Sequence, residues 1–156
     1  FGVTGLGLKW PNDILHNNKK LSGILLEMQG DPAGVCQVVV GVGLNVDMSG
    51  ANTGEISQPW TDLAQAVGVV DRNRLVAELM SAMYVVYKEF SSSGFTVHKE
   101  EWCRHDAFAG REVKVQLGDT YIEGVVAGLD RSGGLLLMTA DGERVFNGGE
   151  VSLRSA

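Results

Sequence analysis

The sequence predicts an α/β fold of the α+β kind, in which a mixed sheet with packed helices is followed by a small β-barrel. Three observations favour it: short apolar runs between turn residues, then apolar residues at helical spacing, then five short strands joined by glycine turns. Glycine supplies 21 of the 156 residues. That is about twice its usual share of roughly 7%, and it favours tight turns and close approach of the backbone to a ligand.

The first strands lie between residues 6 and 46. Pro11 lacks a backbone donor and keeps the residue before it extended, so we expect the chain to turn directly after it. Asn17-Asn18 tolerates the left-handed backbone of a hairpin turn. Apolar runs rich in branched side chains predict strands over residues 6–10, 14–15, 21–28 and 35–42.

The middle of the chain is predicted to be a loop followed by helices. Residues 48–60 are polar and show neither a helical nor a strand period. A short helix from Thr61 is expected to stop at Gly68, and Asp71 is expected to cap a longer one. A third helix is expected over 96–104. Apolar residues at three- and four-residue steps predict the core face of the long helix, namely Leu75, Leu79, Met83, Val86 and Phe90.

The last third of the chain reads as a small β-barrel. Turns rich in glycine separate short apolar strands, and a barrel of about 45 residues is too small to be very stable alone. The predicted strands cover residues 112–117, 121–129, 135–139, 144–147 and 151–153. We therefore predict two domains, 1–109 and 110–156.

Charge and hydropathy exclude two classes of protein. With 13 Lys and Arg against 19 Asp and Glu, the net charge is −6, so the chain is not expected to bind nucleic acid by itself. The longest apolar run is far shorter than the roughly 20 residues that span a bilayer. Because the sequence shows no export signal and has two cysteines, we expect a cytoplasmic location.

One segment combines the groups that an adenylation reaction needs. Asn12 and Asp13 lie in a turn, and Lys20 lies in the hairpin that follows. A lysine can neutralise a carboxylate and an α-phosphate, a carboxylate can hold Mg²⁺, and an amide can bind an adenine edge. A solvated hairpin with ordinary lysines is the alternative reading, and it suits each of these residues taken singly.

A second segment, Gly41-Val42-Gly43-Leu44-Asn45, ends an apolar strand. Glycines there would let a flat or chain-like ligand lie on the backbone, and Asn45 could reach a phosphate or ribose. The segment lacks the G-x-G-x-x-G spacing of a dinucleotide fold.

These motifs, taken in order, resemble the biotin protein ligase family. The blocks are Lys-Trp-Pro-Asn-Asp, Lys-Leu-x-Gly-Ile-Leu-x-Glu and Gly-x-Gly-x-Asn. Residues 148–155, Gly-Gly-Glu-Val-Ser-Leu-Arg-Ser, resemble the end of the bacterial members, where an SH3-like barrel follows the catalytic domain. The resemblance covers nearly the whole chain, and it implies that residues 110–156 form that SH3-like barrel.

The resemblance implies an ATP-dependent, two-step reaction with Mg²⁺. Biotin and ATP give biotinyl-5′-AMP, and a lysine of a biotin carboxyl carrier protein then takes the biotinyl group. On the matching positions, Lys20 would be catalytic and hold the biotin carboxylate and the α-phosphate. Asp13 would be catalytic and support the phosphate and metal region, while Gly23 and Gly43 would line the biotin tail.

The same resemblance assigns the nucleotide side of the site. Asn12 would contact the adenine, Asn45 would bind phosphate or ribose, and residues 48–60 would form an adenylate-binding loop with Trp60 near the adenine. A polar loop carrying one large aromatic residue suits this role, since an acyl-adenylate hydrolyses unless water is shut out.

The family's Gly-Arg-Gly-Arg-x-Gly segment does not occur here, so we expect the N-terminal portion of the catalytic domain to be missing. The first alternative is therefore a non-catalytic ligase fragment that only binds ligand or dimerises. The second is a lipoate-protein ligase, against which the Lys-Trp-Pro-Asn-Asp block argues. The resemblance also suggests a homodimer in which residues 30–34 take part.

Overall fold

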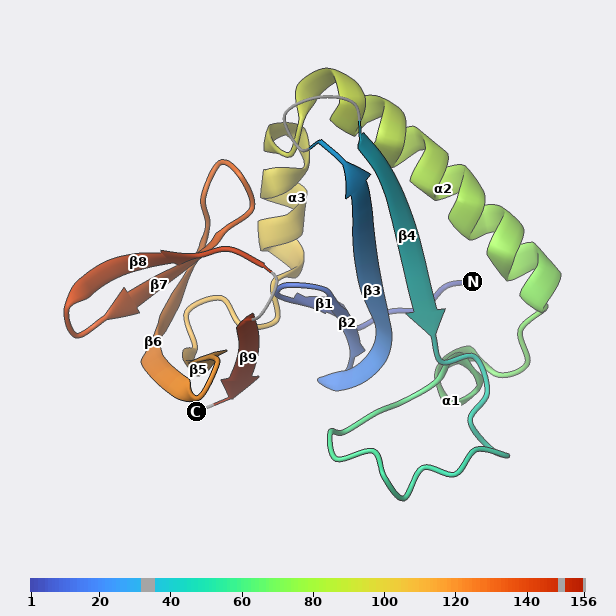
Figure 1. The fold of residues 1–156 in the computed structure, drawn as a ribbon. Helices are drawn as coiled ribbons and strands as arrows, with labels where there is room; N and C mark the ends of the chain where they lie inside the picture. The colour runs from blue at the N-terminus through green and yellow to red at the C-terminus, as the bar shows by residue number, and fades with distance from the viewer. Residues whose placement is uncertain (32–35, 149–150, 156) are drawn as a thin grey trace. The chain divides into compact units, whose positions relative to one another are not determined.

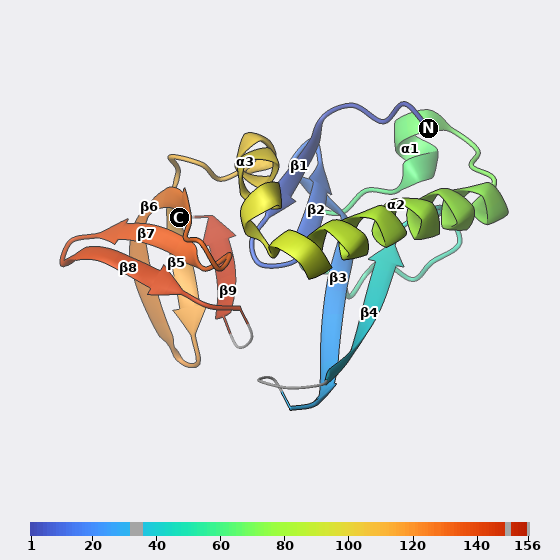
Figure 2. The same cartoon turned by 90° about the horizontal axis from the view of Figure 1, so that it is seen from above.

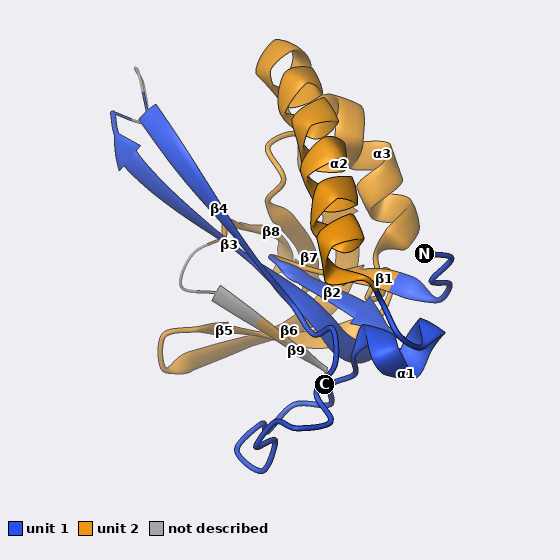
Figure 3. Ribbon diagram, turned by 90° about the vertical axis from the view of Figure 1, so that its right-hand side faces the viewer, with its two compact units in different colours: residues 1–6, 12–70 blue, residues 7–11, 71–156 orange. Residues whose placement is uncertain are grey.

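The computed structural model describes residues 1–31, 36–148 and 151–155, in two compact units (Figure 3). The first unit contains residues 1–6 and 12–70, and the second contains residues 7–11 and 71–156. Most of the predicted 30–34 loop, and Gly149 and Glu150 of the C-terminal motif, lie outside the described residues. The predicted domain boundary between residues 109 and 110 stays a prediction.

The first unit is built on antiparallel strands (Figure 1). Its hairpin turn, Asn17-Asn18, has φ values of 50° and 63°, which confirms the predicted left-handed turn. The long strand β3 pairs with β2 on one side and with β4 on the other. The elements are β2 (Asp13–His16), β3 (Lys19–Gly30), β4 (Cys36–Leu44) and the short helix α1 (Leu63–Val67).

The buried side chains described in the first unit belong to β2, to the start of β3 and to residues 61–63 at the start of α1. The buried apolar side chains are Leu15, Leu21 and Leu63. Three polar residues, Ser22, Thr61 and Asp62, are buried beside them. The distal part of the β3–β4 hairpin is different, since Leu25 and Leu26 of β3 are 60% and 62% exposed.

The second unit begins with β1 (Leu6–Lys9), of which residues 7–9 belong to it, and continues with two helices. In α2 (Arg72–Ser93), Asp71 caps the N-terminus and Gly94, at φ 64°, ends the helix. The next helix is α3 (Thr96–His105). The predicted core stripe of α2 is only partly buried: Leu75 is buried, whereas Val86 and Phe90 are 46% and 54% exposed.

A five-stranded sheet ends the second unit, with the order β8-β7-β6-β5-β9 and antiparallel ladders throughout (Figure 2). Its core is made of fully buried side chains, namely Val113, Val115, Leu135, Leu137 and Leu153. All five predicted strands form. They are β5 (Glu112–Leu117), β6 (Thr120–Leu129), β7 (Leu135–Thr139), β8 (Gly142–Phe146) and β9 (Val151–Ser155).

The predicted α+β class is confirmed. Where we expected a mixed sheet, the ladders that join the described strands within each unit are antiparallel, and parallel pairing is confined to isolated bridges such as Lys20 to Trp60. Among the described ladders, none joins β8 to β9, so the five strands form an open sheet there. None of the helices in the described part of the chain has the length and apolar character needed to cross a membrane.

Candidate adenylation site

An ion pair lies at the start of β3. Lys20 Nζ is 2.6 Å from Asp13 Oδ1, and the two side chains are 30% and 12% exposed. A partly exposed pair of this kind contributes little to stability, about 0–1 kcal/mol. Its main effect is to hold the ammonium group in one direction while leaving it accessible from solvent.

An irregularity in the ladder brings Lys20 to this face. Asp13 pairs with Gly23 across the β2–β3 ladder, so their side-chain positions share a face. In a regular strand, residues three apart point to opposite faces, which would turn Lys20 away from Gly23. However, Ile14 pairs with Ser22 and Leu15 with Lys20, so β3 carries one extra residue between them. A Cβ atom at Gly23 would consequently lie only 3.3 Å from Lys20 Nζ.

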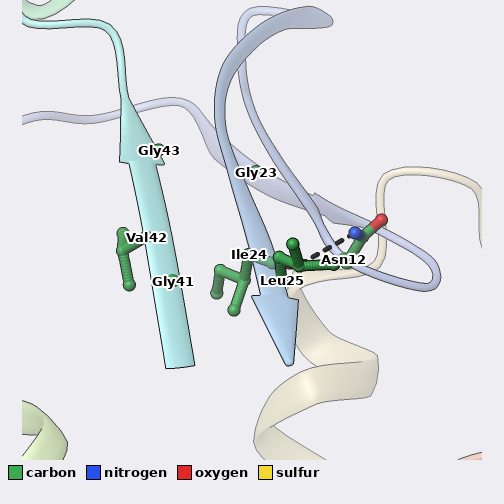
Figure 4. Close-up of a pocket in the computed structure, with 7 residues that line it drawn as sticks. All are labelled: Asn12, Gly23, Ile24, Leu25, Gly41, Val42 and Gly43. Carbon is green, nitrogen blue, oxygen red and sulfur yellow. Dashed lines mark hydrogen bonds between the residues drawn. The ribbon is translucent and has the colours of Figure 1, made fainter. Parts of the chain in front are cut away.

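Beside the ion pair lies a cavity of about 410 Å³, whose walls come from β3, β4 and the turn before β2 (Figure 4). Gly23 and Gly43 are register partners, and the Cβ position of Gly43 is 3.7 Å from the carbonyl oxygen of Gly23. The floor is therefore bare backbone, on which a ligand can lie closely. The residues that line the cavity are Asn12, Gly23, Ile24, Leu25, Gly41, Val42 and Gly43.

Asn12 is held beside β3, on the side away from β4 (Figure 4). Its Nδ2 donates to the carbonyl oxygen of Ile24 at 2.8 Å, and the Ile24 amide donates back to the Asn12 carbonyl oxygen at 2.9 Å. The side chain thus lines the same cavity as the two glycines. Its side-chain carbonyl oxygen and second amide hydrogen remain to be matched by a ligand.

The other predicted residues, Asn45 and Trp60, lie next to the backbone of Lys20 and not next to its ammonium group. The Lys20 amide donates to the Pro59 carbonyl oxygen, and the Thr61 amide donates to the Lys20 carbonyl oxygen, both at 2.9 Å. Asn45 Nδ2 donates to the Thr61 carbonyl oxygen at 2.9 Å and to that of Lys20 at 3.4 Å. Because the amide hydrogens of Asn45 face the backbone, its side-chain oxygen is the better group for a ligand, which favours a ribose hydroxyl over a phosphate.

Asp62 was not among the predicted site residues, yet it is 3% exposed and joins both ends of the 48–60 loop. Its Oδ2 accepts from the Met48 amide at 2.9 Å, and its Oδ1 accepts from the Gln65 amide at 2.8 Å. Burial by itself raises the pKa of Asp62, but the hydrogen bonds from Gln65 and Met48 outweigh this and leave the pKa below its ordinary value. The carboxylate is therefore ionised at neutral pH. An acidic residue before an apolar helix start was the only sequence signal.

The positions of the possible metal-ligating side chains can be compared with the predicted Mg²⁺ site. Within residues 1–31, 36–148 and 151–155, no three His, Cys, Asp or Glu side chains are grouped as a metal site would require. Mg²⁺ is often held by one or two carboxylates together with substrate phosphates. Asp13, beside the cavity, fits such an ion carried with a nucleotide, and it does not fit an ion held by protein alone.

The geometry thus brings the predicted residues into one network. Asn12, Gly23 and Gly43 line the cavity, and the Lys20–Asp13 ion pair lies against Gly23. Asn45 and Trp60 are joined to the Lys20 backbone. The segment Gly41 to Asn45, singled out from the sequence, also supplies Gly41 and Val42 to the cavity, whereas reasoning from sequence gave no role to Ile24 and Leu25 and missed the Asp62 bridge.

Comparison with known proteins gives two matching family descriptions. Residues 5–45 match the biotin/lipoate A/B protein ligase family, and residues 108–154 match the biotin protein ligase C terminal domain. The first match contains the Lys20–Asp13 pair and the glycine-lined cavity.

Individual relatives agree with these matches. The bifunctional ligase/repressor BirA of Escherichia coli is 36% identical over 99% of this chain and 48% of its own length. A biotin–acetyl-CoA-carboxylase ligase of Paracoccus denitrificans is 31% identical over 94% of this chain and 62% of its own length. The chain thus spans roughly half to three fifths of the length of these two curated relatives.

Solved structures agree in fold. The biotin protein ligase from Aquifex aeolicus, in complex with biotin and ATP, superposes with a TM-score of 0.84 at 32% identity, over 97% of this chain and 62% of that one. The structure of the same ligase without ligand gives 0.84 as well. The motifs, the fold and both family matches agree, and this chain belongs to the biotin protein ligase family.

Proposed function

We propose that this chain carries the adenylating part of a biotin protein ligase, which activates biotin with ATP and transfers it to a lysine of a biotin carboxyl carrier protein. The observation that carries the proposal is the Lys20 ammonium group, held 2.6 Å from Asp13 at the edge of a glycine-lined cavity. A related ligase has been solved with biotin and ATP bound. The first candidate substrates are therefore biotin and ATP.

In the first step, an oxygen of the biotin carboxylate attacks the α-phosphorus of ATP, and the bond from that phosphorus to the pyrophosphate oxygen breaks. Negative charge grows on the α-phosphate oxygens in the transition state. The Lys20 ammonium group lies where it can neutralise both this charge and that of the attacking carboxylate. Asp13 would help to hold Mg²⁺ brought with the nucleotide, and that ion would supply further positive charge to the phosphates.

In the second step, the amine of a carrier lysine attacks the acyl carbon of biotinyl-5′-AMP. The bond from that carbon to the phosphate oxygen breaks, AMP leaves, and the new amide nitrogen loses a proton. Gly23 and Gly43 would hold the biotin tail on the backbone, and Asn12 and Trp60 would contact the adenine. Asn45 would receive a ribose hydroxyl through its side-chain oxygen.

The first test removes the ammonium group. We expect Lys20→Ala to lower the rate of pyrophosphate release, with biotin and MgATP, by about 10²–10³-fold, the effect of removing one preorganised charge-stabilising group. The fold should persist, because the partly exposed Lys20–Asp13 pair contributes little stability. Lys114→Ala is the matched control, since Lys114 is also ion-paired on a strand, 2.8 Å from Glu123 in the second unit. Equal rates in the Lys20 variant and its control would remove Lys20 from the mechanism.

A binding measurement separates an active ligase from a ligand-binding fragment. Calorimetric titration with biotinyl-5′-AMP samples the cavity and the loop together. Tight binding that is weakened by Lys20→Ala would support the site, and competition with lipoate would test the substrate. A folded chain that does not bind biotinyl-5′-AMP would contradict the proposal, and binding of the lipoyl adenylate alone would favour a lipoate-protein ligase instead.

A homodimer is also part of the proposal. Strand β2 pairs with β3 only as far as Gly23, and no described strand of the first unit pairs with residues 26–30 on the side away from β4. Free backbone donors and acceptors along such an edge can pair with a second strand. Sedimentation velocity with and without biotin and ATP tests this, and a monomer under both conditions would contradict it. We place the reaction in the cytoplasm, where the two free cysteines would remain reduced.

A further inference from the structure

The two ends of the 48–60 loop meet at one buried carboxylate. Asp62 Oδ1 caps helix α1 through the Gln65 amide at 2.8 Å. Its Oδ2 accepts from the Met48 amide at 2.9 Å, which lies 14 residues earlier in the chain. A helix cap needs only one acceptor, so the second oxygen is free to join the beginning of the loop to its end.

The same end of the loop is joined to the proposed reaction centre. Thr61, the neighbour of Asp62, donates its amide to the Lys20 carbonyl oxygen at 2.9 Å. The Pro59 carbonyl oxygen accepts from the Lys20 amide at 2.9 Å. Trp60 is therefore fixed between two hydrogen bonds to a single residue of β3. Any shift of Asp62 would move the loop relative to the Lys20 backbone.

Two cavities lie against this part of the loop, and Trp60 lines both. One, of about 280 Å³, is bordered by Met48 and Asp62. The other, of about 400 Å³, is bordered by Ile56 and Gln58. The position of the loop therefore sets the shape of both cavities.

We propose that Asp62 is a positioning residue, which holds both ends of the 48–60 loop beside Lys20 so that the loop can receive the nucleotide. This inference rests on the proposed function. Asp62 acts through the Met48 amide and the Thr61–Lys20 contact, and it does not need to touch the substrate. Its loss should therefore weaken use of ATP more than use of biotin, whose cavity is lined by β3, β4 and Asn12 and not by the 48–60 loop.

One substitution separates the loop bridge from the helix cap, and a second removes one of the two hydrogen bonds. In Asp62→Ser, the hydroxyl group still caps α1, but it is too short to reach the Met48 amide as well. In Asp62→Asn, the side chain keeps its size but has one acceptor oxygen, so one of the two hydrogen bonds is lost. The matched control is Asp71→Ser. Asp71 also caps a helix, α2, through the Asn73 and Arg74 amides, and serine preserves that cap.

We expect Asp62→Ser to raise the KM for MgATP about tenfold and the KM for biotin less than about twofold, as the loss of one hydrogen bond to a charged group predicts. Amide hydrogen exchange over residues 48–60 should become about tenfold faster in the absence of substrates. Asp62→Asn, whose one acceptor oxygen can serve either amide, should change neither value by more than Asp62→Ser does, and Asp71→Ser should change neither.

The outcomes separate this inference from the proposed function. Unchanged exchange in the loop, or an equal rise in both KM values, would overturn the inference even when pyrophosphate release by the unsubstituted protein is normal. A protein that releases no pyrophosphate from biotin and MgATP, and that binds no biotinyl-5′-AMP, would instead overturn the proposed function.

Discussion

Each of the two sheets is stabilised internally in a different way. In the sheet of the second unit, Val113, Val115 and Leu137 have no exposed surface. In the first unit, β3 and β4 pair through Gly23 and Gly43. The residues of the candidate site are held there by backbone hydrogen bonds and by the buried carboxylate of Asp62. The difference indicates that side-chain packing stabilises the sheet of the second unit, whereas the sheet of the first unit leaves glycine backbone exposed in a cavity where a ligand can bind.

Two glycines illustrate the same contrast. A Cβ atom at Gly124, in β6, would lie 2.5 Å from the Met138 carbonyl oxygen, a distance that side chains do not tolerate. A Cβ atom at Gly43, in β4, would be 3.7 Å from the Gly23 carbonyl oxygen, an ordinary contact. One glycine is required by the packing of strands, and the other leaves space that a ligand can use.

The largest effect is expected from truncation in the buried sheet. Leu137→Ala should lower the free energy of unfolding of its unit by about 2–5 kcal/mol, because it removes a fully buried side chain and leaves a cavity. Leu25→Ala, on the exposed part of β3, should change it by less than about 0.5 kcal/mol. Urea denaturation measures both. Similar losses in the two variants would break the contrast between the sheets.

The two glycines give the next effect. Gly124→Ala should destabilise its sheet by about 1–3 kcal/mol through overpacking against Met138 and Leu137. Gly43→Ala should leave the unfolding midpoint nearly unchanged and weaken binding of biotinyl-5′-AMP, because its methyl group enters the cavity. Thermal unfolding and calorimetry on both variants test this. A stable Gly124 variant, or a Gly43 variant with unchanged affinity, would contradict the assignment.

The smallest effect concerns Asp106, the C-cap of α3. Burial raises its pKa above the ordinary value of 3.8, and the hydrogen bond from the Phe108 amide and the charge of Arg111 offset only part of this. Because the folded state favours the protonated form, its contribution to stability is present below pH 3.8 and is lost as the pH rises through the raised value.

Asp106→Asn stays neutral at every pH and keeps an acceptor for the Phe108 amide. It should therefore be more stable than the unsubstituted protein at pH 7, by less than about 1 kcal/mol because solvent still screens a partly buried group, and equally stable near pH 3. Urea denaturation at the two pH values measures the difference. A stabilisation that does not change with pH would assign the effect to something other than the charge.

Local signals predicted much of the fold. The turn at Asn17-Asn18, the Asp71 cap and the Gly68 stop depend on neighbouring residues, and each was confirmed. The start of β8 differs by two residues, since the ladder reaches Gly142 at φ 111° in the turn. Boundaries of this kind depend on the partner strand, which a single sequence does not show.

The candidate site was predicted less completely, because its geometry depends on long-range pairing. The motifs singled out Lys20 and Asp13, and the ladder places them together. Nothing in the sequence indicates that Asp62 reaches Met48, since the hydrogen bond spans a loop with no period of its own. The exposure of an apolar helix face also depends on residues that are distant in the sequence. The helical spacing of Val86 and Phe90 in α2 therefore could not show that both side chains are partly exposed.

The extra residue in β3 makes the site depend on the length of the chain as well as on its chemistry. Deletion of the buried residue Leu21 would remove none of the proposed contact residues from the sequence. It would nevertheless restore the regular alternation of β3 and turn the Lys20 side chain to the other face of the sheet. Deletion of this one residue is thus expected to lower the rate of pyrophosphate release as much as loss of the lysine itself. When related chains are compared, a gap at this position carries as much information about activity as a substitution.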